Sequence, residues 1–321
     1  MRGISKASGA WSRNVAIAVA AGLGLAGLFL APSASAGLSC RYVAAGPDGP
    51  RGNRLEIKAT RFEEVVALLP GKGSNIEVTD DQRMKPLACK GGKPTMVNID
   101  RVNFTADRRA TGSSIYIAEA PEFGPGATPA EAGGKGITFI AKGPSLSFGI
   151  GGTDGPDLIQ MGMEGKAAAV DFFPDLYPDS ESGDNIDAKI YAKFVNLLVR
   201  GGRGADAIAG SQIDYSSTWF SGPLRVPTSI YGEVGPDALT GGKSMDYLDG
   251  GPGGDFMLGA QGADQLFGGG GIDTFIAGPG RDEIDALDGT GGEDLRCGRG
   301  RDLARMDLED QDRDCESFRF P

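Results

Sequence analysis

Residues 250–258 read Gly250-Gly251-Pro252-Gly253-Gly254-Asp255-Phe256-Met257-Leu258, and this nine-residue pattern recurs from Tyr231 to Asp285. An aspartate returns every nine residues, and an apolar residue follows each aspartate two positions later. The aspartates are Asp237, Asp246, Asp255, Asp264, Asp273 and Asp282. The apolar residues are Leu239, Leu248, Met257, Leu266, Phe275 and Ile284. This common register predicts a repeat architecture around which the rest of the chain is organised.

The physical chemistry of one unit requires that units stack. Glycines permit the positive-φ backbone of a tight turn, and one unit cannot bury its single apolar side chain alone. Two units then make one coil, with Asp237, Asp255 and Asp273 on one side and the other three aspartates opposite. Strands of successive coils lie roughly 4.8 Å apart, so carboxylates on each side approach and repel one another. A hard dication, which takes roughly six to eight oxygen ligands, relieves that repulsion.

The pattern Gly-Gly-x-Gly-x-Asp-x-apolar-x is that of a calcium-binding β-helix repeat. The stretch resembles the haemolysin-type, or repeats-in-toxin (RTX), calcium-binding family of secreted bacterial proteins. The resemblance implies an all-β parallel solenoid (a β-roll or β-helix) that binds Ca²⁺ through the six aspartates and nearby glycine carbonyls. The alternative is that Asp and Gly only mark turns, which does not explain the apolar partners. Ser244 replaces the glycine two residues before Asp246, so we expect the weakest site there.

Looser copies of the unit precede the regular repeats. Residues 201–209 fit the full consensus and contain Asp206, whereas residues 151–159 fit it in part and contain Asp157. We therefore take Asp206 as a further candidate calcium ligand and Asp157 as a weaker one, with simple turn formation as the alternative at both. The solenoid is expected to begin in these wider coils, and residues 211–229 are expected to leave the stack.

The first 36 residues have the pattern of an export signal. Arg2, Lys6 and Arg13 form a basic segment, residues 15–31 are apolar, and Ala34-Ser35-Ala36 provides a cleavage site. A retained membrane anchor is the alternative, because the apolar segment is near the lower limit of roughly 17 residues for a membrane span. We predict cleavage, which gives a secreted, extracellular protein with no membrane span.

Charge and composition exclude several classes of function. The chain has 43 acidic and 32 basic residues, and 29 basic residues remain without the export signal. Such an acidic protein is unsuited to nucleic acid, whose phosphates require a basic surface. The chain contains no histidine, which excludes zinc sites and nucleophilic pairs that depend on it.

Four cysteines in an exported chain predict two disulfides. Of the three possible pairings, we favour the local one, Cys40–Cys89 with Cys297–Cys315. Free thiols are the alternative. Neither pair has the Cys-x-x-Cys spacing of a redox motif.

The N-terminal region consists of short alternating segments typical of half-buried strands. These lie at residues 55–59, 76–78, 97–99, 115–117 and 146–148. Phe62, Val65, Val66 and Leu69 have helical spacing instead, and the Pro70-Gly71 pair would end such a helix, so this element is ambiguous.

The predicted organisation has five parts. They are a signal peptide (1–36), a β-rich N-terminal region (37–148), irregular solenoid coils (149–230), a regular calcium-binding β-roll (231–285) and a disulfide-pinned C-terminal cap (286–321). The predicted function is that of a non-enzymatic structural or surface-interaction protein, with calcium ions and a cell-surface or matrix polysaccharide as partners. The alternative is a secreted polysaccharide lyase or epimerase on a β-helix, which would need a compact cluster of Asp, Arg, Lys or Tyr outside the turns.

Overall fold

A computed structural model describes residues 37–44, 53–71, 75–80, 85–95, 99, 101–118, 138–171, 188–211 and 221–319. The chain forms two compact units, Met1–Ser147 and Phe148–Pro321, each considered by itself below. Every regular element in the described ranges is a β-strand, which confirms the all-β prediction. In these ranges no helix is long and apolar enough to cross a membrane. The proposed signal peptide lies outside the described residues.

The N-terminal unit contains a row of four strands. The strands β1 (Leu38–Val43) and β2 (Arg54–Ala59) are antiparallel. The strand β7 (Arg101–Ala106) then runs parallel to β2, and the first part of β9 (Thr138–Gly151) runs parallel to β7. Alternate residues are buried, as in Leu55 and Ile57 of β2, because successive side chains point to opposite faces. These strands confirm the alternating pattern at 55–59.

A second group of strands in this unit is centred on β3 (Val65–Pro70). The strand pairs antiparallel with β4 (Ile76–Asp80) and parallel with β8 (Ser113–Ile117). Two short strands, β5 (Lys85–Pro86) and β6 (Cys89–Lys90), follow β4. The predicted strands at 76–78, 115–117 and 146–148 are therefore present, the last within β9. The segment 97–99 lies outside the described residues apart from Ile99.

The helical interpretation of residues 62–69 is wrong. Val66, Ala67 and Leu68 are consecutive and all buried, and β3 has a hydrogen-bonded neighbour on each side. A strand covered on both faces carries a continuous apolar run instead of an alternating one, and part of such a run matches helical spacing by chance. Phe62, which completed the helical pattern, is 64% exposed and precedes the strand.

Both predicted disulfides are present. Cys40 lies opposite Cys89 where β1 pairs with β6. Cys297, in β21 (Asp294–Arg299), is bonded to Cys315 near the end of the described chain. The bonded cysteines are separated by 49 and 18 residues in the sequence. In the chain-entropy model each bond lowers the entropy of the unfolded chain and so stabilises the folded state by about 3–4 kcal/mol.

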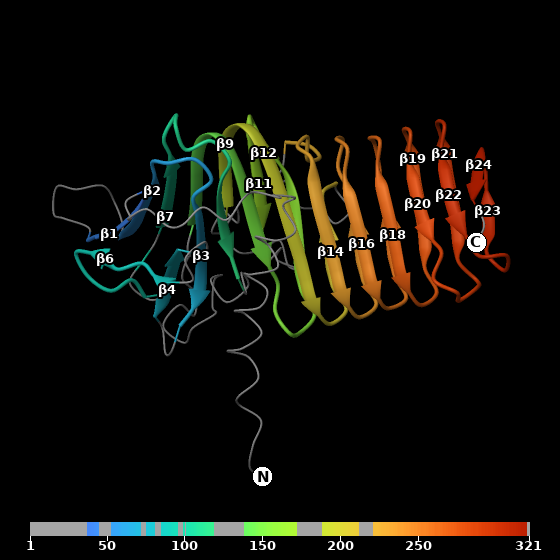
Figure 1. Ribbon diagram of the computed structural model, residues 1–321, viewed down its shortest axis with the longest axis horizontal. Helices are drawn as coiled ribbons and strands as arrows, with labels where there is room; N and C mark the ends of the chain where they lie inside the picture. Colours follow the sequence, from blue (N-terminus) through green and yellow to red (C-terminus); the bar gives the residue numbers. More distant parts are fainter. Residues whose placement is uncertain are drawn as a thin grey trace, which may run out of the picture. The chain divides into compact units, whose positions relative to one another are not determined.

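Most of the C-terminal unit is a parallel β-solenoid (Figure 1), and antiparallel pairs occur only near its start in the described chain. It begins with β10 (Leu158–Glu164), β11 (Ala167–Asp171), β12 (Ala188–Arg203) and β13 (Ala207–Ala209). The strands of the regular coils are β14 (Thr228–Val234), β15 (Ala238–Thr240), β16 (Tyr247–Pro252), β17 (Phe256–Leu258), β18 (Gln265–Gly270), β19 (Thr274–Pro279) and β20 (Glu283–Ala286). The last strands are β21, β22 (Leu303–Met306), β23 (Gln311–Arg313) and β24 (Ser317–Arg319).

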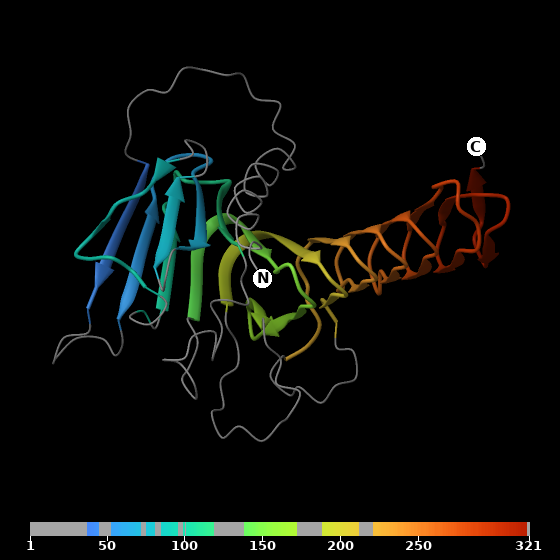
Figure 2. The ribbon, with the colours of Figure 1, turned by 90° about the horizontal axis from the view of Figure 1, so that it is seen from below.

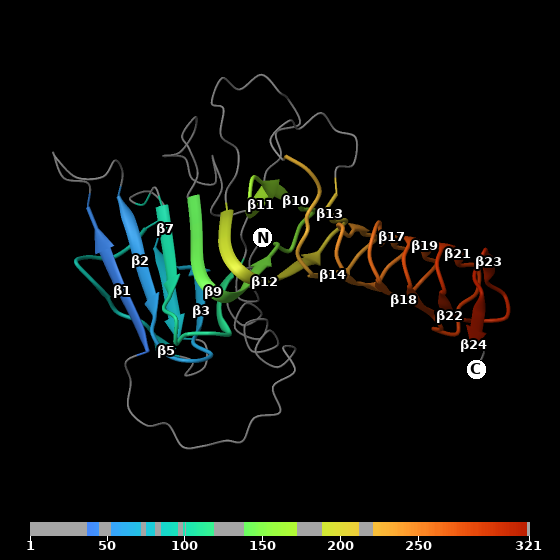
Figure 3. The same cartoon turned by 90° about the horizontal axis from the view of Figure 1, so that it is seen from above.

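Each strand of the regular coils pairs in parallel with the strand after next. Leu248 of β16 lies opposite Leu266 of β18, which lies opposite Ile284 of β20, so the coil contains eighteen residues. Figure 3 shows β17, β19 and β21 along one side of the roll, and β18 and β22 along the other. Figure 2 shows that this part of the unit is only two layers of strands thick. The predicted parallel roll is confirmed.

The core of the roll lies between these two layers. The apolar residue of every repeat is fully buried there, and these residues are Leu239, Leu248, Met257, Leu266, Phe275 and Ile284. The repeat aspartates are also buried, with exposures of 1–3%. Because residues two apart on an extended chain point the same way, the apolar residue and the aspartate of a unit share the inner face.

The solenoid begins before the regular repeats, as predicted. Parallel pairing of β10 with β13 places Leu158 opposite Ala207, and pairing of β13 with β15 places Ala207 opposite Ala238. These earlier coils are longer than eighteen residues, because insertions separate their strands. Of the predicted excursion at 211–229, residues 212–220 lie outside the described residues, whereas Thr228 and Ser229 belong to β14 and pair with β12, so the excursion ends earlier than predicted.

We expect the substitution Leu266→Ala to destabilise the calcium-loaded protein by about 2–5 kcal/mol, because it leaves a cavity in a core with one large side chain per repeat. Gln265→Ala, at the exposed neighbouring position, should change the free energy of unfolding by less than about 0.5 kcal/mol. Urea denaturation followed by circular dichroism measures both. Equal effects of the two substitutions would contradict the two-layer core.

Candidate metal centre

The turn aspartates form two columns along the solenoid. The first column contains Asp157, Asp206, Asp237, Asp255 and Asp273. The second column contains Asp246, Asp264, Asp282 and Asp302. The structure thus groups all seven predicted ligands, with Asp206 and the weaker candidate Asp157 extending the first column. Residues nine apart, such as Asp255 and Asp264, belong to different columns.

A repeated hydrogen bond links neighbours within each column. The backbone N–H of Asp237 donates to Oδ1 of Asp255 at 2.8 Å, and the N–H of Asp255 donates to Oδ1 of Asp273 at 2.8 Å. The second column repeats this bond between Asp264 and Asp282, also at 2.8 Å. Each carboxylate is therefore fixed against the backbone of the preceding coil, and its second oxygen is left for another partner.

That second oxygen is buried and has no hydrogen-bond partner at most positions of the columns. The unpaired Oδ2 atoms belong to Asp206, Asp237, Asp255, Asp264, Asp282 and Asp302. Burial of an anionic oxygen without a hydrogen-bond partner destabilises the folded state. Because such an oxygen recurs in successive coils, the destabilisation adds up along the column. A regular row of such atoms fits a cation that the turns are built to receive.

Backbone carbonyls lie beside these oxygens because the turns use glycine. A Cβ atom added at Gly250 would overlap Oδ2 of Asp255 and lie 2.7 Å from the carbonyl oxygen of Gly268. At Gly253, a Cβ atom would overlap the carbonyl oxygen of Gly235 in the preceding coil. Carboxylate and carbonyl oxygens thus lie close to the backbone of these turns, in space that the two glycines leave open.

The chemistry of this donor set fits calcium. Within the described residues no three acidic or cysteine side chains gather at one point, so each site would combine carboxylates with carbonyls. Ca²⁺ binds several hard oxygen ligands of these two kinds, and it does not require histidine or thiolate ligands. The aspartates of adjacent coils would hold the ion, which would supply the positive charge that the buried carboxylates lack.

Burial changes the protonation of these aspartates. The pKa of Asp255 and of Asp264 is raised to about 7, mainly by desolvation and also by neighbouring carboxylates, while backbone N–H donors oppose the shift. The pKa of Asp206 is likewise raised to about 7 by burial, and that of Asp282 to about 6. Asp206, Asp255 and Asp264 are therefore partly protonated near neutral pH in the cation-free protein.

Asp246 differs from the other repeat aspartates, but not through Ser244. The residue Ser244 does not have a left-handed backbone, so a glycine is not required there. Asp246 instead begins its column next to Thr228, whose N–H donates to its Oδ1 at 3.0 Å, and the N–H of Gly242 donates to its Oδ2 at 2.6 Å. Both oxygens are occupied, which is the physical difference from the interior of the column.

Two further positions of the columns were missed by the nine-residue count. Asp302 accepts a hydrogen bond from the N–H of Asp282 at 2.9 Å, twenty residues earlier. Glu293 follows Asp273 in the first column, since the N–H of Asp294 donates to the carbonyl of Asp273. Glu293 is 1% exposed, and burial together with the neighbouring carboxyl of Asp310 raises its pKa to about 8. The available signal was Leu295, two residues after Glu293.

Comparison with known families agrees with this geometry. Residues 229–257 and 258–294 match the family model of the RTX calcium-binding nonapeptide repeat (4 copies). Residues 229–294 are RTX repeats. The matched segments contain the six regular aspartates and Glu293, and exclude Asp206. No curated protein sequence and no solved structure matches the chain.

We expect aspartates of one column to cooperate in calcium binding by these RTX repeats. In a double-mutant cycle, Asp255→Ala and Asp273→Ala should couple by roughly 0.5–3 kcal/mol in calcium affinity, because their carboxylates belong to adjacent coils. Asp255→Ala and Asp264→Ala should be additive within about 0.5 kcal/mol. Calorimetric titration measures both cycles. Stronger coupling at a spacing of nine would show that ions are not shared along the columns.

We expect the cation-free protein to lose stability as the pH rises from about 4 to about 7. The folded pKa of Asp255 and Asp264 is raised to about 7 from an ordinary value of 3.8. Their protonation therefore stabilises the fold fully below that ordinary value and ceases to do so as the pH passes 7. Urea midpoints measured on metal-free protein test this, and Asp255→Asn with Asp264→Asn should flatten the dependence. A midpoint that increases over this interval would contradict it.

Calcium binding should release protons for the same reason, because a carboxylate must be ionised to bind the ion. Titration in weakly buffered solution should release more protons per ion near pH 6.5 than near pH 8. Absence of any release at the lower pH would show that the buried aspartates are already ionised.

Proposed function

We propose that this protein is a secreted, non-enzymatic β-roll whose fold is completed by calcium, and that it serves a structural or surface-interaction role outside the cell. The observation that carries the proposal is the pair of carboxylate columns, with buried Oδ2 atoms that have no partner in the described chain. RTX repeats are calcium-binding repeats, and these columns supply oxygen donors and negative charge along the whole roll.

Calcium would act here as a structural ion. The residues Asp237, Asp246, Asp255, Asp264, Asp273, Asp282 and Asp206 are the proposed ligands, together with turn carbonyls. Asp255 fixes its carboxylate through Oδ1 and turns Oδ2 toward Gly250 of its own turn, and the same Oδ2 contact recurs at Gly201, Gly232, Gly241, Gly259 and Gly268. Because binding occurs in the folded state and not in the unfolded chain, the binding free energy becomes folding free energy.

The two disulfides support the proposed extracellular location. Disulfides persist in oxidising compartments and are rare in reducing ones, and every cysteine of the chain is paired. The pattern of an export signal in residues 1–36 also supports an extracellular location. Extracellular fluids also contain calcium at concentrations that weak structural sites can use.

We expect calcium to increase the β content and the thermal midpoint of the full-length protein. Circular dichroism in chelator should show a reduced β signal, since the N-terminal unit does not depend on the columns, and calcium should restore it. Magnesium should restore less, because it requires near-octahedral geometry and keeps its water. A full β signal in chelator that calcium leaves unchanged would refute a structural role for the ion.

A matched pair of glycine substitutions sharpens this test. Gly250→Ala places a Cβ atom on the free oxygen of Asp255, whereas Gly270→Ala meets no atom closer than 4.0 Å. We expect Gly250→Ala to raise the calcium concentration needed for folding by about tenfold or more, equivalent to about 1.4 kcal/mol. Gly270→Ala should leave that concentration within about twofold. Similar shifts for both would mean that the effect comes from general loss of glycine flexibility.

A further inference from the structure

An open cleft in the N-terminal unit has no role in the calcium sites. Its volume is about 810 Å³, and the described residues that line it are Thr60, Arg61, Phe62, Asp107, Arg108 and Arg109. We refer to it as the arginine cleft. Three of these six residues are arginines, although the chain as a whole carries a formal charge of −11.

The strand arrangement brings these side chains together. Strands β2 and β7 are parallel, with Ala59 opposite Ala106. The segment 60–63 follows β2 and the segment 107–110 follows β7, so both segments lie at the carboxyl ends of these two neighbouring strands. The carboxyl ends of adjacent parallel strands are a common place for ligand sites in other sheets, because loops from two strands converge there.

Hydrogen bonds fix the backbone of both segments. The N–H of Asp107 donates to the carbonyl of Ala59 at 2.9 Å, and the N–H of Ala110 donates to the carbonyl of Asp107 at 2.9 Å. On the other side, the N–H of Thr60 donates to the carbonyl of Gly37 at 2.8 Å. Ala110 is fully buried and anchors the turn that presents Arg108 and Arg109. The arginines therefore project from a preorganised backbone, which lowers the entropy lost on binding.

The guanidinium groups of the arginine cleft are available to a ligand. Arg61, Arg108 and Arg109 are exposed and form no ion pair within the part of the chain that the structure describes. Asp107 is the one acidic residue among the described lining, which leaves an excess of positive charge. Guanidinium groups bind oxyanions such as carboxylate and sulfate through two parallel hydrogen bonds.

Acidic and basic residues are distributed unevenly between the N-terminal and C-terminal parts of the chain. Residues 37–147 contain 15 basic and 12 acidic residues, whereas residues 148–321 contain 14 basic and 31 acidic residues. The acidic excess is thus confined to the part of the chain that holds the carboxylate columns. The N-terminal unit is the part suited to an anionic partner.

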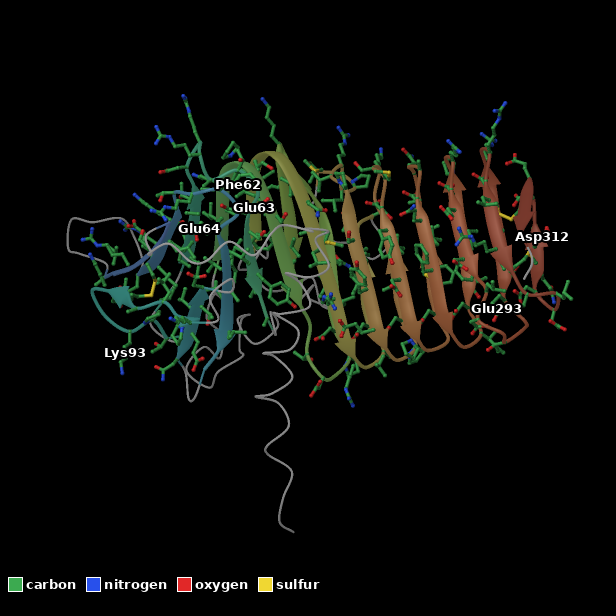
Figure 4. All side chains as sticks on the ribbon, viewed as in Figure 1. Phe62, Glu63, Glu64, Lys93, Glu293 and Asp312 are labelled. Atoms are coloured by element: carbon green, nitrogen blue, oxygen red, sulfur yellow. A yellow bond between two sulfur atoms is a disulfide. The ribbon has the colours of Figure 1, made fainter. Side chains whose placement is uncertain are left out.

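Phe62 adds an apolar surface beside the positive charges. Its side chain is 64% exposed, and Figure 4 shows it with Glu63 in the segment that precedes β3. An aromatic ring with polar and charged neighbours is a typical lining for a ligand that has both apolar and polar faces. Sugar rings that carry acidic groups have this combination.

We propose that the arginine cleft binds an acidic polysaccharide, with Arg61, Arg108 and Arg109 paired with its oxyanion groups and Phe62 against a sugar ring. This inference rests on the proposed function, since it names the partner class of the surface-interaction role. A hollow lined by charge suits a polymer chain that lies in it, whereas a flat membrane would need a protruding surface. Nucleic acid has a much denser charge and would be repelled by the acidic remainder of the chain.

The test is direct binding of short acidic oligosaccharides to the full-length, calcium-loaded protein. The probes are oligogalacturonate, which carries carboxylates, and a sulfated heparin-derived oligosaccharide, with a neutral dextran-derived oligosaccharide as the control. We expect at least one acidic probe to bind, the neutral one not to bind, and affinity to fall as salt rises from about 50 to about 200 mM. The acidic probe that binds identifies the oxyanion.

Two triple variants with the same charge change separate a specific site from general attraction. Replacing Arg61, Arg108 and Arg109 with Gln should weaken binding by about tenfold or more. Replacing Arg41, Lys85 and Lys90 with Gln, at exposed positions of the same unit outside the cleft, should change affinity by less than about twofold. Phe62→Ala should also weaken binding, without changing its salt dependence.

Three results would overturn the proposal. They are failure of both acidic probes to bind, equal loss of binding in the two triple variants, and binding of the protein to anionic lipid vesicles in place of either oligosaccharide. The calcium-induced change in circular dichroism is measured on every variant and should be retained. Absence of this calcium response in the unsubstituted protein would instead count against the proposed structural role of the ion, so the two failures are distinguishable.

Discussion

The solenoid depends on one constraint, which is that the aspartate and the apolar residue of each repeat share the inner face of the roll. A strand places residues two apart on the same side, so burial of Met257 in the core also buries Asp255. The resulting carboxylates are partly satisfied by backbone N–H groups of the preceding coil. Their remaining oxygens are not. The fold therefore buries negative charge as a condition of burying its apolar side chains.

Much of the rest of the C-terminal unit follows from this constraint. Glycine leaves room where a turn passes close to a carboxylate, as at Gly250. The columns end where other groups can take the place of the next aspartate, such as Thr228 beside Asp246. At the opposite end, Glu316 accepts a hydrogen bond from the N–H of Asp302 at 2.8 Å, next to the disulfide partner Cys315. The last described coils thus close the column with a side chain and pin the chain covalently.

The regular repeats could be predicted because local pattern and coil geometry have the same period there. The eighteen-residue coil, the two sides and both disulfide pairings followed from spacing alone. Prediction failed where insertions changed the coil length. Counting by nine beyond Asp282 leads to Gly291, but a coil of twenty residues brings Glu293 into the column. The position of Asp157 in the first column was not evident from the sequence for the same reason, because 49 residues separate it from its neighbour Asp206.

The N-terminal unit was harder to predict, because no repeat constrains it. Alternating segments predicted the half-buried strands. By contrast, β3 is buried on both faces, and its apolar run fitted helical spacing as well as it fitted a buried strand. The arginine cleft had no sequence signal at all. Its two segments are separated by more than forty residues, and only the parallel register of β2 and β7 brings them to one edge.

The hydrogen bond between successive coils also has a consequence for how such a gene can change. Each bond joins one turn to the equivalent turn eighteen residues later. Duplication or loss of a whole coil by unequal recombination would therefore recreate the same bonds at the junction, with both ends of the roll unaltered. Each added coil would lengthen the roll by about 4.8 Å. The length of the protein is thus a heritable variable that can drift in uniform steps without a new fold.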